Sequence, residues 1–297
     1  MEPNTPSRMN LVARAKLTFT YAVVSLTAIL PASAETLEVL ASKTHYHGIA
    51  FARSGSAKLL LASHHGLFAL TKDGEATRVS PVHDYMGFSP DPSDPLSYYA
   101  SGHPAGGGNF GFLKSPDGGA TWKQLSPGVG GPVDFHQMDV SPADPKTIYG
   151  NYGELQVSRD GGQSWTVAGT PPTGLIALAA SSLKSDQLYA ATKQGLSASV
   201  DAGASWQPLA FVGEVVSTVE VEPDGSLLAF VLERGLMKAS ESKPDEWTLL
   251  SNGFGGAIPL HIAIDPTNPN HLVLTTQENG VLESIDSGAT WAPFGKS

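Results

Sequence analysis

The sequence predicts an all-β fold, a six-bladed β-propeller, from a recurring phrase, its constant spacing and the length of the chain. The phrase has eight residues and ends in tryptophan, and complete copies span residues 115–122, 158–165, 199–206 and 284–291. With two degenerate copies it closes at positions 78, 122, 165, 206, 247 and 291, in steps of 44, 43, 41, 41 and 44 residues. A constant period of this length is typical of repeat architectures.

One repeat contains four short β-prone segments. In the third repeat these segments are residues 134–140, 147–149, 155–158 and 164–167, and turn-forming residues separate them. Short strands joined by tight turns predict an antiparallel meander, and a ring of such meanders is a propeller, usually of about 4–8 blades. The stretch 35–297 has room for six repeats of about 44 residues, so six blades are favoured over seven.

The ends of the repeat region leave two ways to close the ring. Residues 35–40 can supply an outer strand to the last blade, and residues 291–294 also have the character of that strand. The sequence supports both alternatives.

Residues 1–34 have the pattern of a secretory signal peptide. Three basic residues form a positive beginning, residues 17–30 are apolar and uncharged, and Ala32 and Ala34 stand at the −3 and −1 positions of a cleavage site. The apolar run is short for a membrane span of about 20 residues, so cleavage is favoured over retention as an anchor. We expect an exported propeller domain of residues 35–297, periplasmic or secreted, with no membrane insertion after cleavage.

Composition excludes several classes of function. Without residues 1–34, the 28 acidic and 18 basic residues of the chain become 27 and 15, a formal charge of about −12. Nucleic acids and anionic lipid surfaces require a basic face, so neither is expected as a partner. The chain has no cysteine, which excludes disulfides, thiolate metal sites and blue-copper centres.

The aspartate of each complete phrase has a structural interpretation. Asp117, Asp160, Asp201 and Asp286 stand where a carboxylate can accept hydrogen bonds from N–H groups of its own turn. The closing tryptophan can pack a large ring against the neighbouring blade. A residue that recurs once in each blade serves the scaffold, so function is expected where the repeats differ.

The phrase S-x-D-x-G-x-x-W resembles the Asp-box, or BNR, repeat. Together with the segments HGIAF, MGFSPDP, SGHP and DFHQM, it makes the chain similar to secreted bacterial Asp-box proteins called glycosyl-hydrolase-like. The wider family includes sialidases, other glycoside hydrolases, sortilin-type receptors and photosystem II assembly factors. The resemblance implies a propeller and leaves the activity open, because one fold serves many functions.

The histidines gather on one predicted face. In a propeller, the loops between blades and the turns between second and third strands share a face, here called the upper face, and the Asp-box turns lie opposite. By this rule only His271 falls on the Asp-box side. The other eight histidines, in blades 6, 1, 2 and 3, are His45, His47, His64, His65, His83, His103, His136 and His261.

Imidazoles that converge with carboxylate and thioether groups can bind a transition metal. The first candidates for such a site are His47, His103 and His136. Further candidates are His45, His64, His65 and His83, with Asp84 and Met138 as supporting groups. Without thiolate, imidazole favours Cu(II), Zn(II) or Ni(II), and the nearby methionine favours copper. Surface histidines that bind no metal are the alternative.

Arginine placement excludes sialidase chemistry. Sialidases hold the substrate carboxylate with three arginines, and lysine does not replace bidentate arginine. Residues 35–297 contain Arg53, Arg78, Arg159 and Arg234, of which only the last is expected on the upper face.

A different glycoside hydrolase is the competing function. It requires two carboxylates about 5–5.5 Å or 6.5–9.5 Å apart, and Asp84, Asp134 and Glu154 are weak candidates on the upper face. No spacing in the sequence selects a pair. The favoured function is therefore binding or assembly, with a protein or glycan ligand on the upper face.

Overall fold

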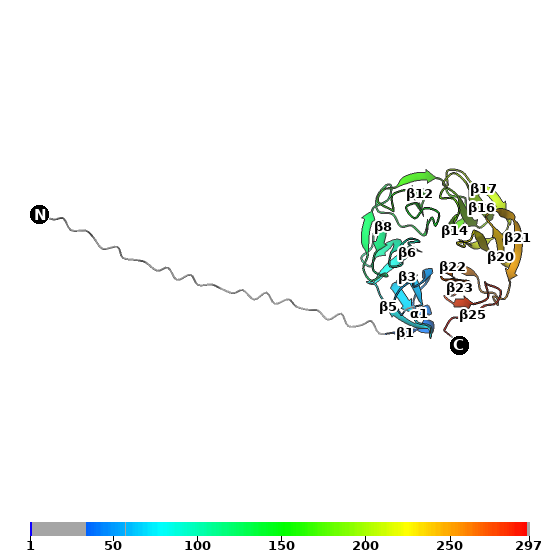
Figure 1. The fold of residues 1–297 in the computed structure, drawn as a ribbon, viewed down its shortest axis with the longest axis horizontal. Coiled ribbons are helices and arrows are strands. Elements are labelled where there is room, and N and C mark those ends of the chain that lie inside the picture. Colours follow the sequence, from blue (N-terminus) through cyan, green and yellow to red (C-terminus); the bar gives the residue numbers. More distant parts are fainter. Residues whose placement is uncertain (2–33, 57, 296–297) are drawn as a thin grey trace. The chain divides into compact units, whose positions relative to one another are not determined.

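Six antiparallel sheets surround a central axis in the computed structural model, which describes residue 1, residues 34–56 and residues 58–295 (Figure 1). Five sheets have four strands and one has five, so the predicted all-β, six-bladed propeller is confirmed. The predicted signal peptide, residues 1–34, falls outside the described residues except at its two ends. Within the described part of the chain, no helix is long and apolar enough to cross a membrane.

Each blade is a meander in which strands pair in chain order, and the first strand of each blade contacts the first strands of both neighbours. Blade 1 contains β2 (Tyr46–Phe51), β3 (Leu59–Ser63), β4 (Gly66–Leu70) and β5 (Glu75–Arg78). Blade 2 contains β6 (His83–Pro90), β7 (Tyr98–Pro104), β8 (Phe112–Ser115) and β9 (Lys123–Ser126). Blade 3 contains β10 (Gln137–Val140), β11 (Ile148–Tyr152), β12 (Glu154–Ser158) and β13 (Thr166–Gly169).

The other three blades repeat this arrangement. Blade 4 contains β14 (Leu175–Ala180), β15 (Leu188–Thr192), β16 (Gly195–Ser199) and β17 (Gln207–Ala210). Blade 5 contains β18 (Val216–Val221), β19 (Ser226–Val231), β20 (Gly235–Ser240) and β21 (Lys243–Ser251). Blade 6 contains β22 (Pro259–Asp265), β23 (Asn268–Thr276), β24 (Val281–Ser284) and β25 (Ala292–Pro293).

Within the described residues, the ring closes through packing, and neither end of the chain adds a strand to the blade at the other end. Blade 6 takes its outer strand, β25, from the C-terminal end, which decides between the two predicted alternatives. The N-terminal strand β1 (Glu35–Thr36) pairs instead with β5 as a fifth strand of blade 1. A short helix, α1 (Leu37–Ala41), follows β1, and Asn279 of blade 6 donates a hydrogen bond to its last carbonyl at 3.0 Å.

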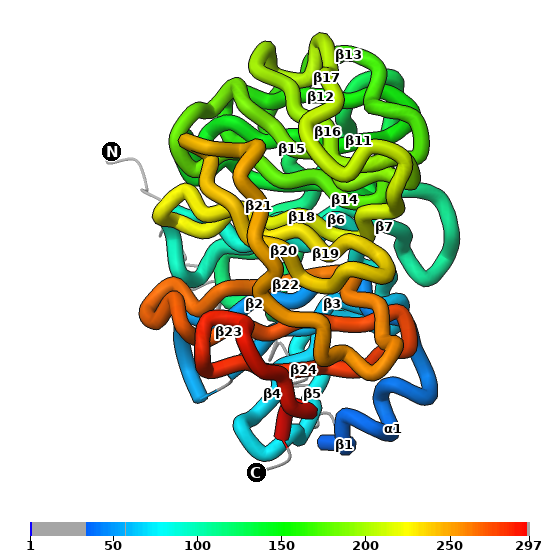
Figure 2. Tube along the Cα trace, turned by 90° about the vertical axis from the view of Figure 1, so that its right-hand side faces the viewer, coloured from blue at the N-terminus to red at the C-terminus, as the bar shows by residue number. Residues whose placement is uncertain are grey.

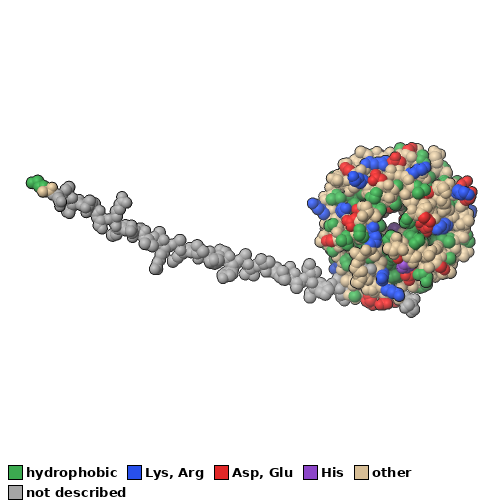
Figure 3. Space-filling view, in the orientation of Figure 1, with side chains coloured by type: hydrophobic (Ala, Val, Ile, Leu, Met, Phe, Trp, Pro, Cys, Tyr) green, Lys and Arg blue, Asp and Glu red, His purple; other side chains and the backbone are tan. Residues whose placement is uncertain are grey.

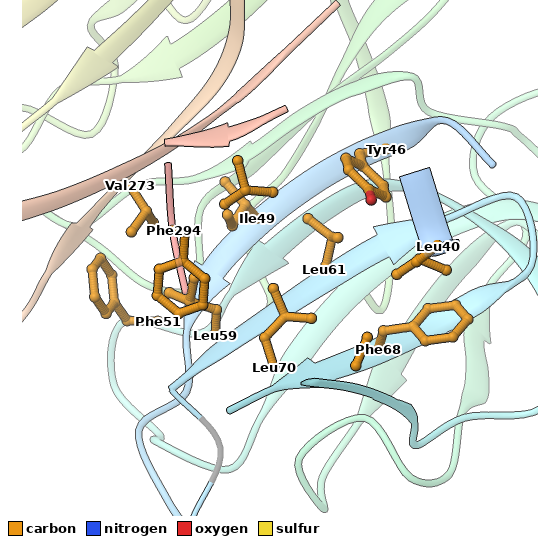
Figure 4. Close-up of a cluster of buried hydrophobic side chains, with 12 residues drawn as sticks. Leu40, Tyr46, Ile49, Phe51, Leu59, Leu61, Phe68, Leu70, Val273 and Phe294 are labelled. Carbon is orange, nitrogen blue, oxygen red and sulfur yellow. The ribbon is translucent and has the colours of Figure 1, made fainter. Parts of the chain in front are cut away.

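A shared apolar cluster joins the last blade to the first. Phe294 and Val273 of blade 6 pack with Phe51 and Leu59 of blade 1, and α1 adds Leu40 (Figure 4). The tube view shows the same neighbours, with the red C-terminal blade beside the blue N-terminal one (Figure 2). Burial of this apolar cluster holds blades 6 and 1 together, in place of a strand exchanged between them.

The recurring phrase forms the same hydrogen-bonded turn in blades 2, 3, 4 and 6. In blade 3, Ser158 Oγ donates to Asp160 Oδ1 and accepts the Gly162 N–H, both at 2.8 Å. Asp160 accepts the N–H of Ser164 at 2.9 Å and its hydroxyl at 2.6 Å. These donors, Ser164 first, lower the pKa of Asp160 to about 2. Equivalent bonds surround Asp117, Asp201 and Asp286, so the turn-stabilising role predicted for the four aspartates is confirmed.

The tryptophans pack between blades, as predicted. The Trp165 ring centroid lies 5.1 Å from that of Phe112 and 4.8 Å from that of Phe135, in the cluster between blades 2 and 3. Blade 5 lacks the turn, because β20 and β21 join in a hairpin that pairs Ser240 with Lys243. Its tryptophan, Trp247, still packs between blades 4 and 5.

Candidate functional site

The innermost strands of all six blades line a cavity of about 490 Å³, here called the channel. Three histidines, His47, His136 and His261, belong to its lining, and so do two acids, Asp139 and Glu220. The space-filling view shows the hollow at the centre of the ring, with histidine side chains beside it (Figure 3). Histidine and carboxylate groups thus share the wall of the channel.

Three of these groups form a first cluster between blades 1 and 2, made of His47, His64 and Asp84. His47 Nε2 lies 3.1 Å from His64 Nδ1, and His64 Nδ1 lies 2.8 Å from Asp84 Oδ2. His47 Nε2 is 3.7 Å from Asp84 Oδ1. Two ligand atoms on one ion, each bonded at about 2.0–2.1 Å, must lie within about 4.2 Å of each other. The first cluster meets this condition.

A β-bulge places His47. In the pairing of β2 with β3, Tyr46 lies opposite Ser63 and Gly48 lies opposite Ala62, so His47 has no partner across the ladder. A bulge bends the strand and redirects the unpaired side chain. This residue therefore faces its neighbours from the turn after β3 and from β6, and the simple alternation of side chains along a strand does not apply to it.

A second cluster between blades 2 and 3 consists of His103, Asp134 and His136. His103 ends β7, and the other two residues lie just before β10. The Nε2 atoms of His103 and His136 both lie 2.8 Å from Asp134 Oδ2. The ligand atoms of each cluster lie within 4.8 Å of one another. The second cluster thus presents two imidazoles and one carboxylate to a single point.

Neighbouring groups orient the second cluster. His103 Nδ1 lies 2.9 Å from the Gly108 carbonyl, so Nδ1–H donates there and Nε2 is the nitrogen directed at Asp134. A metal ion would bind this nitrogen in place of a proton. The segment that carries Asp134 is held by the buried Ser101 hydroxyl of β7, which accepts the Phe135 N–H at 3.0 Å. The cluster is therefore supported from behind by hydrogen bonds to blade 2.

Each cluster contains a buried carboxylate oxygen without a hydrogen-bond partner, namely Oδ1 of Asp84 and Oδ1 of Asp134. The Asp134 side chain is only 5% exposed. A buried acceptor that makes no hydrogen bond is costly. A cation placed between the imidazoles and the carboxylate would satisfy it, so the donor set fits a metal ion.

Burial and neighbouring charge shift the pKa values of the channel histidines in opposite directions. Burial first, and then the neighbouring His64, lowers the pKa of His47 to about 4. Burial also lowers the pKa of His261 to about 4. The hydrogen bond to Asp134 is the main reason that the pKa of His136 is raised. His47 and His261 are neutral imidazoles at pH 7, with a lone pair available to a ligand.

The remaining predicted residues lie outside both clusters. His45 is exposed and its ring centroid lies 6.1 Å from that of His64. His65 is exposed, whereas His83 packs on Phe110 at 5.0 Å between ring centroids. Met138 is buried in the core between blades 2 and 3. The structure therefore divides the three first candidates, His47, His103 and His136, between two clusters. It brings His64 and Asp84 to the first of them and leaves His45, His65, His83 and Met138 outside both.

Two carboxylates considered for catalysis belong to the clusters, and the third does not. Asp84 and Asp134 are engaged by histidines, whereas Glu154 is exposed at the start of β12. The face predicted for one arginine is wrong: a side chain added at Gly66, the first residue of β4, would meet Arg78 Cδ at 2.7 Å. Arg78 thus points to the upper face. With Arg234 this makes two arginines there, still short of three.

Sequence reasoning missed the two acids of the channel, Asp139 and Glu220. Burial raises the pKa of Asp139 to about 7 and raises that of Glu220 well above its usual range. Their signal was present, since each acid interrupts an apolar inner strand, and charged residues are rarely buried without a partner.

Comparison with known proteins shows the fold and no more. No protein-family model and no curated protein matches the chain. Solved structures that it resembles include a GH74 enzyme from Niastella koreensis (16% identity, TM-score 0.58) and the GH74 xyloglucanase from Xanthomonas campestris (20%, 0.55). Each match covers 84% of this chain and 45% of the other, so this chain spans about half the length of those enzymes.

A third structure, YCF48 bound to D1 peptide, is 17% identical with a TM-score of 0.52, and the match covers 85% of this chain and 84% of that one. Structural neighbours of this propeller therefore include both glycoside hydrolases and a peptide-binding protein. One fold with several functions makes the local site the basis for any functional conclusion.

Proposed function

We propose that this chain is an exported, periplasmic or secreted Asp-box propeller that acts in binding or assembly and holds a transition metal on its upper face. One observation carries the metal proposal: two imidazoles and the buried Asp134 carboxylate converge on one point, and one oxygen of that carboxylate lacks a partner. The four serine–aspartate–glycine turns support the Asp-box assignment. The expected signal peptide supports export.

The donor set favours copper, with zinc and nickel as the next choices. Both clusters combine two imidazole nitrogens with one carboxylate, and no cysteine is present. Divalent copper binds nitrogen and oxygen donors most strongly among the first-row metals. Met138 is not included among the ligands, because it packs in the core between blades 2 and 3. The proposed ligands are therefore His47, His64 and Asp84 in the first cluster, and His103, Asp134 and His136 in the second.

A protein segment is the proposed partner class. The upper face carries both clusters, and the His64 and His136 side chains are 42% and 54% exposed, so a partner can reach them. The neighbour named as YCF48 bound to D1 peptide supports a peptide as the ligand. A glycan is the alternative ligand for the same surface.

Metal analysis tests this proposal. Protein purified without a polyhistidine tag is loaded with Cu(II) or Zn(II), dialysed and analysed for bound metal. We expect His103→Ala with His136→Ala to remove the metal of the second cluster, and His47→Ala with His64→Ala to remove that of the first. His65→Ala, an exposed histidine outside both clusters, is the matched control and keeps full occupancy. Retention of no metal by the unmodified protein would overturn the proposal.

Glycoside hydrolysis is the second candidate function. Similarity to two GH74 structures and two carboxylates on the upper face favour it. Asp84 and Asp134 each contact histidines, however, and a general acid or nucleophile must be free to reach the glycosidic oxygen or carbon. A panel of aryl glycosides and polysaccharides, with xyloglucan included, tests this function. Turnover that Asp84→Asn and Asp134→Asn abolish would replace the binding proposal.

A further inference from the structure

Two half-buried carboxyl groups line the channel and take no part in the histidine clusters. Asp139 is on β10 and Glu220 is on β18, the inner strands of blades 3 and 5. Both side chains line the cavity, and the charge of Asp139 acts on Glu220. Burial is the main reason that both pKa values are raised. The two groups form an acid pair in the channel wall, where the surrounding protein raises the pKa of both.

The two acids differ in how completely their oxygens are satisfied. Asp139 accepts the Ala180 N–H at 2.7 Å through Oδ2 and the Val140 N–H at 2.8 Å through Oδ1. Within the described part of the chain, the Val221 N–H is the one group found to donate to Glu220. A carboxylate offers about four acceptor positions. Glu220, which is half-buried in the channel wall, therefore keeps acceptor capacity that faces the cavity.

Among the described residues, no lysine or arginine of the channel balances this acid pair. Arg53 is the one lysine or arginine among the described residues that line the cavity. Its guanidinium donates to the Asp94 carbonyl at 2.8 Å and lies over the Tyr98 ring at 5.7 Å. It is thus committed to blade 2, and neither acid has an arginine or lysine among the groups that shift its pKa. Buried charges in proteins are normally paired.

The walls around the acid pair suit an aliphatic chain better than a hydrated metal ion. Ile49, Leu178 and Ile262 are among the apolar side chains that line the cavity. Calcium and magnesium require six or more oxygen ligands, whereas both oxygens of Asp139 already accept backbone N–H groups. An ammonium group needs only a few acceptors and brings three N–H donors. An attached methylene chain can then pack on the apolar wall.

We propose that the channel binds a primary ammonium group at the end of an unbranched aliphatic chain, with Glu220 as its first charge partner and Asp139 as its second. Both a free alkylamine and the lysine side chain of a partner protein have this chemistry. The cavity of about 490 Å³ is several times larger than a cavity of about 150 Å³ that holds benzene, so a five-carbon amine has room. The proposal does not depend on a metal in either histidine cluster.

Calorimetric titration with n-pentylamine tests the proposal, with 1-pentanol as a neutral probe of the same length. The protein used is the exported form expected after signal-peptide cleavage, residues 35–297. We expect the amine to bind at least about tenfold more tightly than the alcohol, a difference of about 1.4 kcal/mol. Glu220→Gln is expected to weaken amine binding by about tenfold or more. Glu154→Gln, which changes an exposed glutamate outside the channel, is the matched control and leaves the affinity unchanged.

Several outcomes would overturn the proposal. Equal affinity for amine and alcohol would indicate an apolar cavity alone, and amine binding that Glu220→Gln leaves intact would place the amine elsewhere. The proposal is also contradicted if neither n-pentylamine nor Nα-acetyl-lysine amide binds. Tighter binding of the lysine derivative assigns the site to a protein side chain, and the reverse assigns it to a free amine. If Glu220→Gln fails to fold, Asp139→Asn carries the same test.

Discussion

His103 Nε2 lies 2.8 Å from Asp134 Oδ2, across the boundary between blades 2 and 3. The contact joins residues 31 positions apart. It depends on the docking of the two blades, which the Ser101 hydroxyl secures through the N–H of Phe135. A site built across a blade boundary is positioned by the packing of the two sheets that carry it. The predictions below test the site, the channel and the scaffold separately.

Replacement of Asp134 by asparagine tests the second cluster at nearly constant volume. The variant loses the negative charge that faces two imidazoles, so we expect Cu(II) or Zn(II) affinity to fall by at least about tenfold. Competition calorimetry against a chelator of known affinity measures the change. Glu154→Gln removes an exposed charge on the same face and should leave the affinity as it was. Equal losses in the two variants would point to a general effect of charge.

The pH dependence of stability tests the burial of Asp139. Burial raises the pKa of this group from 3.8 to about 7, so the folded state holds the proton more tightly than the unfolded state. Its contribution to stability is complete below about pH 4 and is lost as the pH rises through about 7. The titratable groups that share the channel with it are Glu220, His47, His136 and His261.

Asp139→Asn should flatten this dependence. Between pH 5 and 8, we expect the free energy of unfolding to fall by about 1–3 kcal/mol more in the unmodified protein than in the variant. Urea unfolding at both pH values measures the two slopes, and their comparison cancels the fixed cost of placing an amide beside the Ala180 N–H. Parallel slopes would show that Asp139 titrates normally in the folded chain.

Loss of one turn hydroxyl tests the scaffold role of the recurring phrase. Ser158 is buried and bonds both Asp160 and the Gly162 N–H, so Ser158→Ala leaves a buried donor without a partner. We expect a loss of about 1–3 kcal/mol in the free energy of unfolding. Ser242→Ala, in the blade 5 hairpin, is the matched control and should cost less than about 0.5 kcal/mol. Thermal unfolding measures both variants. Equal midpoint temperatures for Ser158→Ala and Ser242→Ala would refute this role.

Ring closure by packing predicts a large effect at Phe294. This side chain is 5% exposed in the cluster that joins blades 6 and 1, and Phe294→Ala should cost about 3–5 kcal/mol. Ile285→Ala removes a side chain of blade 6 that is 76% exposed and should cost less than about 0.5 kcal/mol. Denaturant unfolding measures both. A small effect at Phe294 would mean that other contacts close the ring.

The sequence predicts most residues of the candidate site, but it does not predict that they divide into two clusters. The constant spacing of the repeat predicts that eight histidines lie on one face, and two clusters form there. The spacing of the repeat does not determine which imidazoles lie together. Their grouping depends on the bulge at His47 and on the Gly108 carbonyl that orients His103. The predicted face of Arg78 is also wrong, because its degenerate phrase lacks the tryptophan that packs close to the turn in the complete copies.

The sequence by itself determined the blade count, the turn chemistry and the position of the tryptophans, because these features arise from short-range hydrogen bonds and packing that repeat with a constant period. Tertiary structure alone decided which histidines share a carboxylate, how the ring closes, and that Asp139 and Glu220 enter one channel. Those relations join different blades, with a geometry that depends on how neighbouring sheets pack and twist, and no local pattern of residues records it.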